Sequence, residues 1–86
     1  MYSAYFSRLA EKNFKKIPKN YQLNLKKTIL NLEVNPYTAG TIKLTNYPVA
    51  QYRKRVGDYR ILFDIDEENI IIIIADIRRR TSTTYQ

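Results

Sequence analysis

The spacing of apolar residues predicts helices in the first half of the chain and strands in the second. The segment 2–6 is short and rich in aromatic side chains, which is typical of a strand. From Arg8 the apolar residues follow helical spacing up to Pro18, and a second helical stripe continues to Asn35. Pro18 and Pro36 end these two patterns, because proline disfavours a helical residue before it. We therefore expect one strand followed by two helices.

Beyond the helices the pattern predicts β-hairpins. Residues 37–48 form an expected loop with a short extended piece at 42–44. Three strands are predicted after it, at about residues 50–56, 59–65 and 69–77. Gly57 begins a two-residue connection of the type II′ kind, and residues 66–69 make the second turn. The second half therefore predicts an antiparallel sheet.

The isoleucine run 70–74 shapes the expected core. It is β-branched throughout and too short for most helices, which indicates a strand buried on both faces or a strand with one face open to a partner. Together the elements predict an α+β fold, in which an N-terminal helical hairpin packs on one face of a small antiparallel β-sheet. The length of 86 residues suits a single domain, covering 1–86.

Side-chain alternation within the strands places three arginines on one face. In the strand 59–65 the apolar side chains point towards the helices, which leaves Arg60 on the other face. In the preceding strand Arg53 and Arg55 share a side, so we expect all three on the face that the helices leave open. Lys54 then falls where an inward apolar residue is expected. Either its long side chain extends to the sheet edge, or this assignment of faces is inverted.

The composition restricts the chemistry that this chain can perform. It has no histidine and no cysteine, so we expect no metal site, no thiolate mechanism and no disulfide framework. Proton transfer would have to use tyrosine, lysine, arginine or a carboxylate. No apolar run reaches the roughly 18 residues of a membrane span. The N-terminus lacks the regions of a signal peptide, so we expect a cytoplasmic protein without membrane contact.

The formal net charge of +7 is unevenly distributed. Acidic residues gather in the turn at 64–68, whereas the arginines of the second half stand at positions 53, 55, 60 and 78–80. A hairpin would place these two groups at opposite ends and concentrate positive potential, which suits a polyanion such as nucleic acid. The alternative is a solvated basic surface that favours solubility.

Five segments of the sequence carry a family pattern. They are Phe6-Ser7-Arg8-Leu9-Ala10-Glu11-Lys12, the break Lys16-Ile17-Pro18, the pair Asn35-Pro36, the signature Tyr52-Arg53-Lys54-Arg55-Val56-Gly57-Asp58-Tyr59-Arg60, and the arginine-rich end before Tyr85. In these segments, which span nearly the whole chain, the sequence resembles the RelE/ParE superfamily of bacterial and archaeal toxins. The spacing of Arg79 and Tyr85 is similar to that of the RelE-like ribonucleases.

The resemblance implies a toxin of a type II toxin–antitoxin system, acting as an mRNA interferase. Such ribosome-dependent endoribonucleases cleave mRNA in the ribosomal A site. The RNA 2′-hydroxyl attacks the adjacent phosphate and leaves a cyclic phosphate and a 5′-hydroxyl, without a metal or another cofactor. One alternative is a ParE-like toxin that poisons DNA gyrase and cuts no RNA. Another is a homologue that only binds nucleic acid or its antitoxin.

The resemblance also implies roles for individual residues. Arg53 and Arg55 would hold the phosphate backbone, and one of them could help to lower the pKa of the 2′-hydroxyl. Arg60 would contact the scissile phosphate, Arg79 would lie near the leaving 5′-oxygen, and Tyr85 would stack on a base and orient or deprotonate the nucleophile. The family often has lysine at the positions of Arg53 and Arg55, and arginine is a poor general base because it stays protonated.

Further RNA contacts are expected around these residues. The candidates are Lys54, Arg78, Arg80, Lys19, Lys26 and Lys27. The three helical lysines belong either to a docking face for ribosomal RNA or to an ordinary solvated helix surface.

The resemblance implies an antitoxin as protein partner, besides the ribosome and its mRNA. Such an antitoxin usually wraps the basic toxin with an extended acidic segment, so the free chain is expected to be a monomer and the complex a hetero-oligomer. Leu23 and Leu30 lie seven residues apart and off the buried stripe of the second helix, which makes them candidate antitoxin contacts. The isoleucine strand could instead offer an edge to which a partner strand adds.

Overall fold

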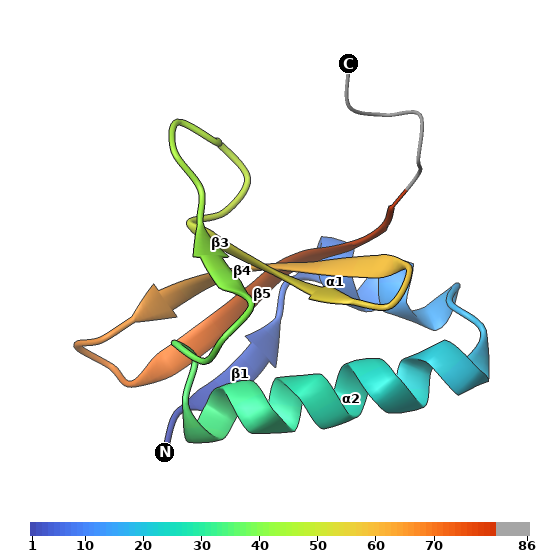
Figure 1. Ribbon diagram of the computed structural model, residues 1–86, viewed down its shortest axis with the longest axis horizontal. Helices are drawn as coiled ribbons and strands as arrows, with labels where there is room; N and C mark the ends of the chain where they lie inside the picture. Colours follow the sequence, from blue (N-terminus) through green and yellow to red (C-terminus); the bar gives the residue numbers. More distant parts are fainter. Residues whose placement is uncertain (81–86) are drawn as a thin grey trace.

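A computed structural model describes residues 1–80 and contains the helices and strands that the sequence predicts (Figure 1). In chain order the elements are β1 (Ser3–Phe6), α1 (Arg8–Lys15), α2 (Lys19–Val34), β2 (Thr41–Lys43), β3 (Tyr52–Val56), β4 (Tyr59–Asp66) and β5 (Ile71–Arg79). Their ends differ from the predicted ones by a few residues only. The observed architecture is therefore the expected α+β fold.

The sheet has five strands in the order β1-β5-β4-β3-β2. Neighbours from β2 to β5 pair antiparallel, as predicted, whereas β1 pairs parallel with β5. The sheet is mixed because the two helices carry the chain from β1 to the opposite edge of the sheet before the hairpins return it. Since β5 lies between β1 and β4, the expectation that the isoleucine strand could offer a free edge is wrong.

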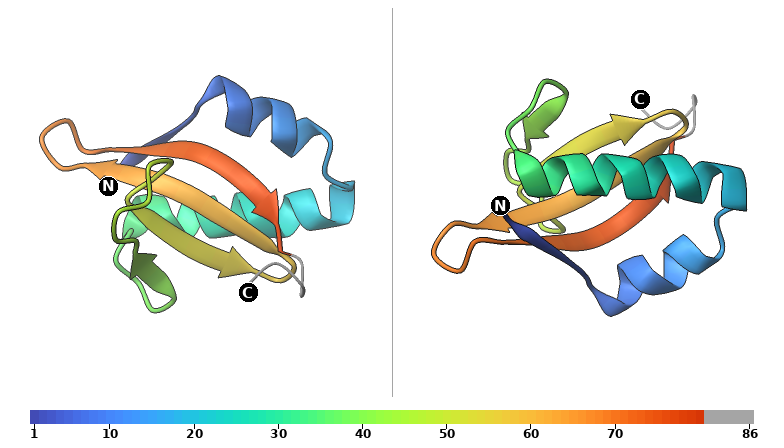
Figure 2. Two further views of the ribbon diagram at one scale, coloured as in Figure 1. Left: turned by 90° about the horizontal axis from the view of Figure 1, so that it is seen from above. Right: turned by 90° about the horizontal axis from the view of Figure 1, so that it is seen from below.

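The helices cover one face of this sheet. Helix α2 lies across it, and α1 lies beside β5 (Figure 2). One hydrophobic cluster joins both helices to the inward side chains of the central strands, with its buried members at Ala10, Ile17, Leu25, Ile29, Leu32, Tyr59, Ile61, Phe63, Ile72, Ile74 and Ile77. The alternation predicted for β4 is confirmed. The opposite face is left open by both helices, and it carries the loop between β2 and β3 (Figure 1).

The isoleucine run of β5 buries only one of its two faces. Ile72 and Ile74 are fully buried in the core, whereas Ile73 is 36% exposed on the other side. The second of the two alternatives drawn from the sequence, a strand with one open face, is therefore correct. After Ile74 the pairing with β4 shifts by one residue, so that Leu62 pairs with Asp76 and Ala75 has no partner in the register. This irregularity has the form of a β-bulge, which re-aims the side chains that follow it.

A two-residue turn joins β3 to β4 as predicted. Gly57 has a φ of +57°, and Asp58 does not have a positive φ, which is the sign pattern of a type II′ turn. The turn fixes the register of the hairpin, in which Arg55 pairs with Arg60.

A cluster of two tyrosines and a glutamate joins three segments at the other end of the sheet. Tyr2 donates a hydrogen bond of 2.6 Å to Oε1 of Glu67, and Tyr37 donates to its Oε2. Its hydrogen bond to Glu67 is the main cause that raises the pKa of Tyr37 from 10.0 to about 12, with lost hydration and the charge of Glu67 as further causes. The hydrogen bond of Tyr2 to Glu67 likewise raises the pKa of Tyr2, and the two hydrogen bonds together lower the pKa of Glu67.

The protein is expected to lose stability as the pH rises from 10 to about 12. In that window the unfolded chain releases the proton of Tyr37 while the folded chain keeps it, so alkali favours unfolding. Urea unfolding at several pH values measures this slope. The Glu67→Gln variant should flatten it, whereas Glu68→Gln, next to it in the turn, should not. Equal slopes in all three proteins would contradict a role for the cluster.

Candidate functional site

Three strands align arginines on the open face of the sheet. Arg55 of β3 pairs with Arg60 of β4, and Arg60 pairs with Arg78 of β5. Arg53 lies two residues before Arg55 on the same face of β3, and it pairs with Leu62 of β4. Because partners in a register share a face, the expected convergence of Arg53, Arg55 and Arg60 is confirmed, and Arg78 joins them.

Arg80 completes this group at the end of β5. Its backbone N–H donates to the carbonyl of Asp58 at 2.6 Å, and its Nη1 lies 3.5 Å from the carbonyl oxygen of Gly57. The residue is therefore attached to the turn between β3 and β4. We call Arg53, Arg55, Arg60, Arg78 and Arg80 together the arginine face.

The electrostatics of Arg60 show how closely these charges lie. Partial burial lowers the pKa of Arg60, and the positive charges of Arg53, Arg55 and Arg80 lower it further, while Tyr47 acts in the opposite direction. Like charges held together by the fold repel one another, and a bound anion would relieve that repulsion. The arginine face is thus suited to a phosphate group, which accepts paired hydrogen bonds from guanidinium groups.

A buried carboxylate fixes the position of Arg78. Asp76 is only 2% exposed, and its Oδ2 accepts a hydrogen bond of 2.7 Å from Nε of Arg78. Its Oδ1 accepts from Nδ2 of Asn13 at 2.7 Å and from the backbone N–H of Ile77 at 2.8 Å. The interaction with Asp76 is the main cause that raises the pKa of Arg78. The side chain of Arg78 is therefore tied through Asp76 to helix α1.

The hydroxyl of Tyr47 is also in contact with the arginine face. Nη1 of Arg78 donates a hydrogen bond of 2.8 Å to this oxygen. Tyr47 belongs to the loop between β2 and β3, and its influence on the pKa of Arg60 places it near that side chain too. Neither Tyr47, Asp76 nor Asn13 was predicted as a site residue. For Asp76 the sequence carries one signal, because it is an isolated carboxylate in the apolar segment before Arg78.

Two residues expected at this site lie on the other side of the sheet. Arg79 pairs with Tyr59, a core residue, so it belongs to the helix-facing side and is not brought together with Arg60. Lys54 pairs with Ile61 on the same side, and its Nζ donates to Thr38 Oγ1 at 3.0 Å and to the carbonyl of Ala39 at 2.9 Å. The side chain of Lys54 thus extends to the neighbouring loop, and the predicted faces are not inverted.

The other predicted contact residues lie away from the arginine face or outside the described part of the chain. Lys19, Lys26 and Lys27 are exposed on α2, which covers the opposite side of the sheet. Leu23 and Leu30 are 69% and 62% exposed on the same helix. Tyr85 lies beyond residue 80, outside the described residues.

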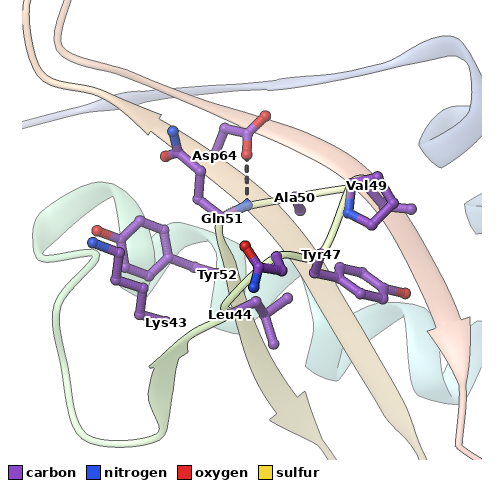
Figure 3. A pocket seen from close by; sticks show the side chains of 10 residues that line it. Lys43, Leu44, Tyr47, Val49, Ala50, Gln51, Tyr52 and Asp64 are labelled. Atoms are coloured by element: carbon purple, nitrogen blue, oxygen red, sulfur yellow. Dashed lines mark hydrogen bonds between the residues drawn. The ribbon is translucent and has the colours of Figure 1, made fainter.

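A cleft of about 640 Å³ lies beside the arginine face. Its lining comes from the β2–β3 loop and the adjoining strand ends, at Lys43, Leu44, Asn46, Tyr47, Pro48, Val49, Ala50, Gln51, Tyr52 and Asp64 (Figure 3). Asp64 accepts a hydrogen bond of 2.8 Å from the backbone N–H of Gln51, which ties the loop to β4. Tyr47 therefore borders both the cleft and the arginine face.

Neither a metal-binding cluster nor a membrane-spanning helix is found in residues 1–80. No three acidic, histidine or cysteine side chains gather there closely enough to hold a metal ion. No helix in this range is long and apolar enough to cross a membrane.

Comparison with known proteins gives a family match and a set of similar folds. The family model of the ParE toxin of type II toxin–antitoxin systems, parDE, matches residues 4–83. A search of curated proteins finds no match.

Solved structures of RelE toxins share the fold. The isolated Escherichia coli RelE toxin has a TM-score of 0.82 at 19% identity, covering 98% of this chain and 89% of that one. The toxin–antitoxin complex RelBE2 of Mycobacterium tuberculosis gives 0.82 at 22% identity, covering 92% and 98%. The archaeal RelE–RelB complex of Pyrococcus horikoshii OT3 gives 0.81 at 23% identity, covering 95% and 98%.

Proposed function

Because the chain belongs to the ParE toxin family of type II toxin–antitoxin systems, within the RelE/ParE superfamily, we propose that it is a toxin that cleaves mRNA in the ribosomal A site. The observation that carries this proposal is the arginine face, a row of guanidinium groups on an open sheet surface. The fold that it shares with RelE toxins supports the same assignment.

The arginine face suits the charge changes of RNA cleavage. When the 2′-oxygen attacks the adjacent phosphate, negative charge grows on the phosphate oxygens, and preorganised guanidinium groups stabilise that charge. Arg60 is central in the row and would bind the scissile phosphate. Arg53 and Arg55 on the neighbouring strand would hold the RNA backbone, and Tyr85 would stack on a base, as the family resemblance implies.

Arg78, rather than Arg79, is proposed to lie near the leaving 5′-oxygen. Arg78 is the cross-strand partner of Arg60, and Asp76 holds its guanidinium in place. Arg79 pairs with Tyr59 on the helix-facing side. The role that the resemblance implies for a C-terminal arginine is therefore assigned to its neighbour.

The Arg78→Ala variant is expected to cleave RNA about 100-fold more slowly, because it loses one charge stabiliser of the transition state. Arg79→Ala removes an equal charge from the adjacent residue and should stay within about threefold of the wild type, as expected for a distant charge. Single-turnover cleavage on programmed ribosomes measures both rates. Equal losses in the two variants would contradict the placement of Arg78.

A gyrase poison is the second candidate function. The family model that matches residues 4–83 is named for ParE toxins, which favours this alternative. Such a toxin would act on a protein target and would leave RNA intact. A homologue that only binds nucleic acid or its antitoxin would neither poison gyrase nor cut RNA.

Purified protein can separate these functions directly. We expect it to cut mRNA on ribosomes stalled with an empty A site, and to leave free mRNA and gyrase-catalysed supercoiling unchanged. Inhibited supercoiling with intact mRNA would favour the gyrase alternative. Intact mRNA together with unchanged supercoiling would indicate a chain that only binds.

We also propose a cognate antitoxin as partner. Structures of RelE with RelB from three organisms support this proposal. The positive arginine face fits an acidic segment, and exposed Leu23 and Leu30 offer apolar anchors on α2. The free toxin is proposed to be a cytoplasmic monomer that forms a hetero-oligomer with the antitoxin.

A further inference from the structure

Tyr47 holds a hydroxyl group next to the arginine face, and the family resemblance gives it no role. Its oxygen accepts the 2.8 Å hydrogen bond from Nη1 of Arg78. Arg78 in turn is held by Asp76, whose other oxygen accepts from Asn13. A chain of hydrogen bonds thus runs from helix α1 to the phenol, and it fixes the oxygen of an exposed loop residue.

This arrangement leaves the hydroxyl proton of Tyr47 available to a ligand. Arg78 occupies one acceptor position of the oxygen, and within residues 1–80 no hydrogen bond from the hydroxyl of Tyr47 to an acceptor is found. Tyrosine is one of few proton carriers in this chain, which has no histidine and no cysteine. Arginine cannot take this part because it stays protonated.

We infer that Tyr47 is a catalytic residue that donates a proton to the leaving 5′-oxygen when RNA is cleaved, an inference that rests on the proposed function. The 2′-hydroxyl loses its proton to solvent, the 2′-oxygen bonds to phosphorus, and the bond from phosphorus to the 5′-oxygen breaks. The 5′-oxygen takes the proton of Tyr47, and the phenolate that remains faces the guanidinium of Arg78. Water then returns a proton to Tyr47.

The location of Tyr47 agrees with this role. A phosphate bound by Arg60 and Arg78 would lie beside the phenol, because Arg78 contacts that oxygen directly. The ring of Tyr47 also borders the cleft of about 640 Å³, which offers space for a nucleoside attached to that phosphate (Figure 3). The hydroxyl is therefore placed between the phosphate and the nucleoside.

A substrate with sulfur in place of the leaving 5′-oxygen tests this proton transfer. Thiols are far stronger acids than alcohols, so a sulfur leaving group departs as thiolate without a proton donor. On programmed ribosomes, Tyr47→Phe should slow single-turnover cleavage of ordinary mRNA by about 100-fold, within the range for general acid catalysis. On the sulfur-substituted mRNA the same variant should lie within about threefold of the wild type, since no donor is required there.

Control measurements separate the loss of the Tyr47 proton from effects on folding or on RNA binding. Tyr5→Phe alters another exposed tyrosine, on β1, and should match the wild type on both substrates. Affinity for a non-cleavable mRNA with a 2′-deoxynucleotide at the cleavage site should be unchanged in Tyr47→Phe. If Tyr47→Phe does not fold, difluorotyrosine at position 47 replaces it, and the alkaline limb of the pH–rate profile should move to lower pH.

Three outcomes would overturn the inference. An equal loss on both substrates would give Tyr47 a structural role only, and no loss on ordinary mRNA would remove it from the mechanism. A wild-type protein that cleaves neither substrate would overturn the proposed function itself, and the inference with it.

Discussion

Replacement of Arg60 by alanine is expected to relieve toxicity and to slow mRNA cleavage by about 100- to 1,000-fold, the loss typical of removing one preorganised stabiliser of transition-state charge. Arg60 is central in the row of three paired arginines and is only partly exposed. Water therefore replaces its guanidinium poorly. Colony counts after induced expression measure the relief, and single-turnover cleavage on ribosomes measures the rate.

Two further variants test whether the guanidinium group of Arg60, and not only its positive charge, is required. Arg60→Lys keeps the charge but loses the paired hydrogen bonds of guanidinium, so its rate should fall between those of alanine and the wild type. Lys12→Ala removes one positive charge from the exposed surface of α1 and should retain full toxicity. If Arg60→Ala remains toxic while its folding and expression match the wild type, the arginine face does not carry the activity.

Replacement of Asp76 by alanine is expected to lower the free energy of unfolding by about 2–4 kcal/mol and to impair cleavage as well. The stability falls because the substitution removes a buried carboxylate and leaves its charged and neutral hydrogen-bond donors without an acceptor. Asn13 and Arg78 both lose their partner in this variant. Arg78 would then be free to leave its position beside Tyr47. Urea unfolding measures the stability, and cleavage by the folded fraction measures the second effect.

An exposed carboxylate provides the matched control for Asp76. Glu68→Ala removes the same charge from the turn between β4 and β5 and should change the free energy of unfolding by less than about 0.5 kcal/mol, as surface substitutions usually do. Asp76→Asn keeps the shape and part of the hydrogen bonding, so its loss should be smaller than that of alanine. An Asp76→Ala protein as stable as the wild type would contradict the structural role of this carboxylate.

The convergence of Arg53, Arg55 and Arg60 was predictable because it depends on local rules. Side chains alternate along a strand, and the turn at Gly57 fixes the register of the hairpin. Those two rules place all three residues without knowledge of the remaining strands. The core positions of β4 at Tyr59, Ile61 and Phe63 followed from the same alternation.

The part of the site on β5 and on the β2–β3 loop depends on longer-range structure. The shift of pairing at Ala75 interrupts the alternation along β5, and spacing in the sequence does not reveal it. Arg78 therefore lies beside Arg60, whereas the family resemblance implied Arg79 as the C-terminal arginine of the site. Tyr47 reaches the site through a loop without a periodic pattern, and the parallel pairing of β1 depends on how the helices cross the sheet.

The most direct test of RNA cleavage through the arginine face is to map RNA ends in cells after induced expression. We expect new 5′-hydroxyl ends within translated reading frames, cyclic phosphates on the matching upstream fragments, and no such ends with Arg60→Ala. Intact messages together with stalled gyrase on DNA would contradict this expectation.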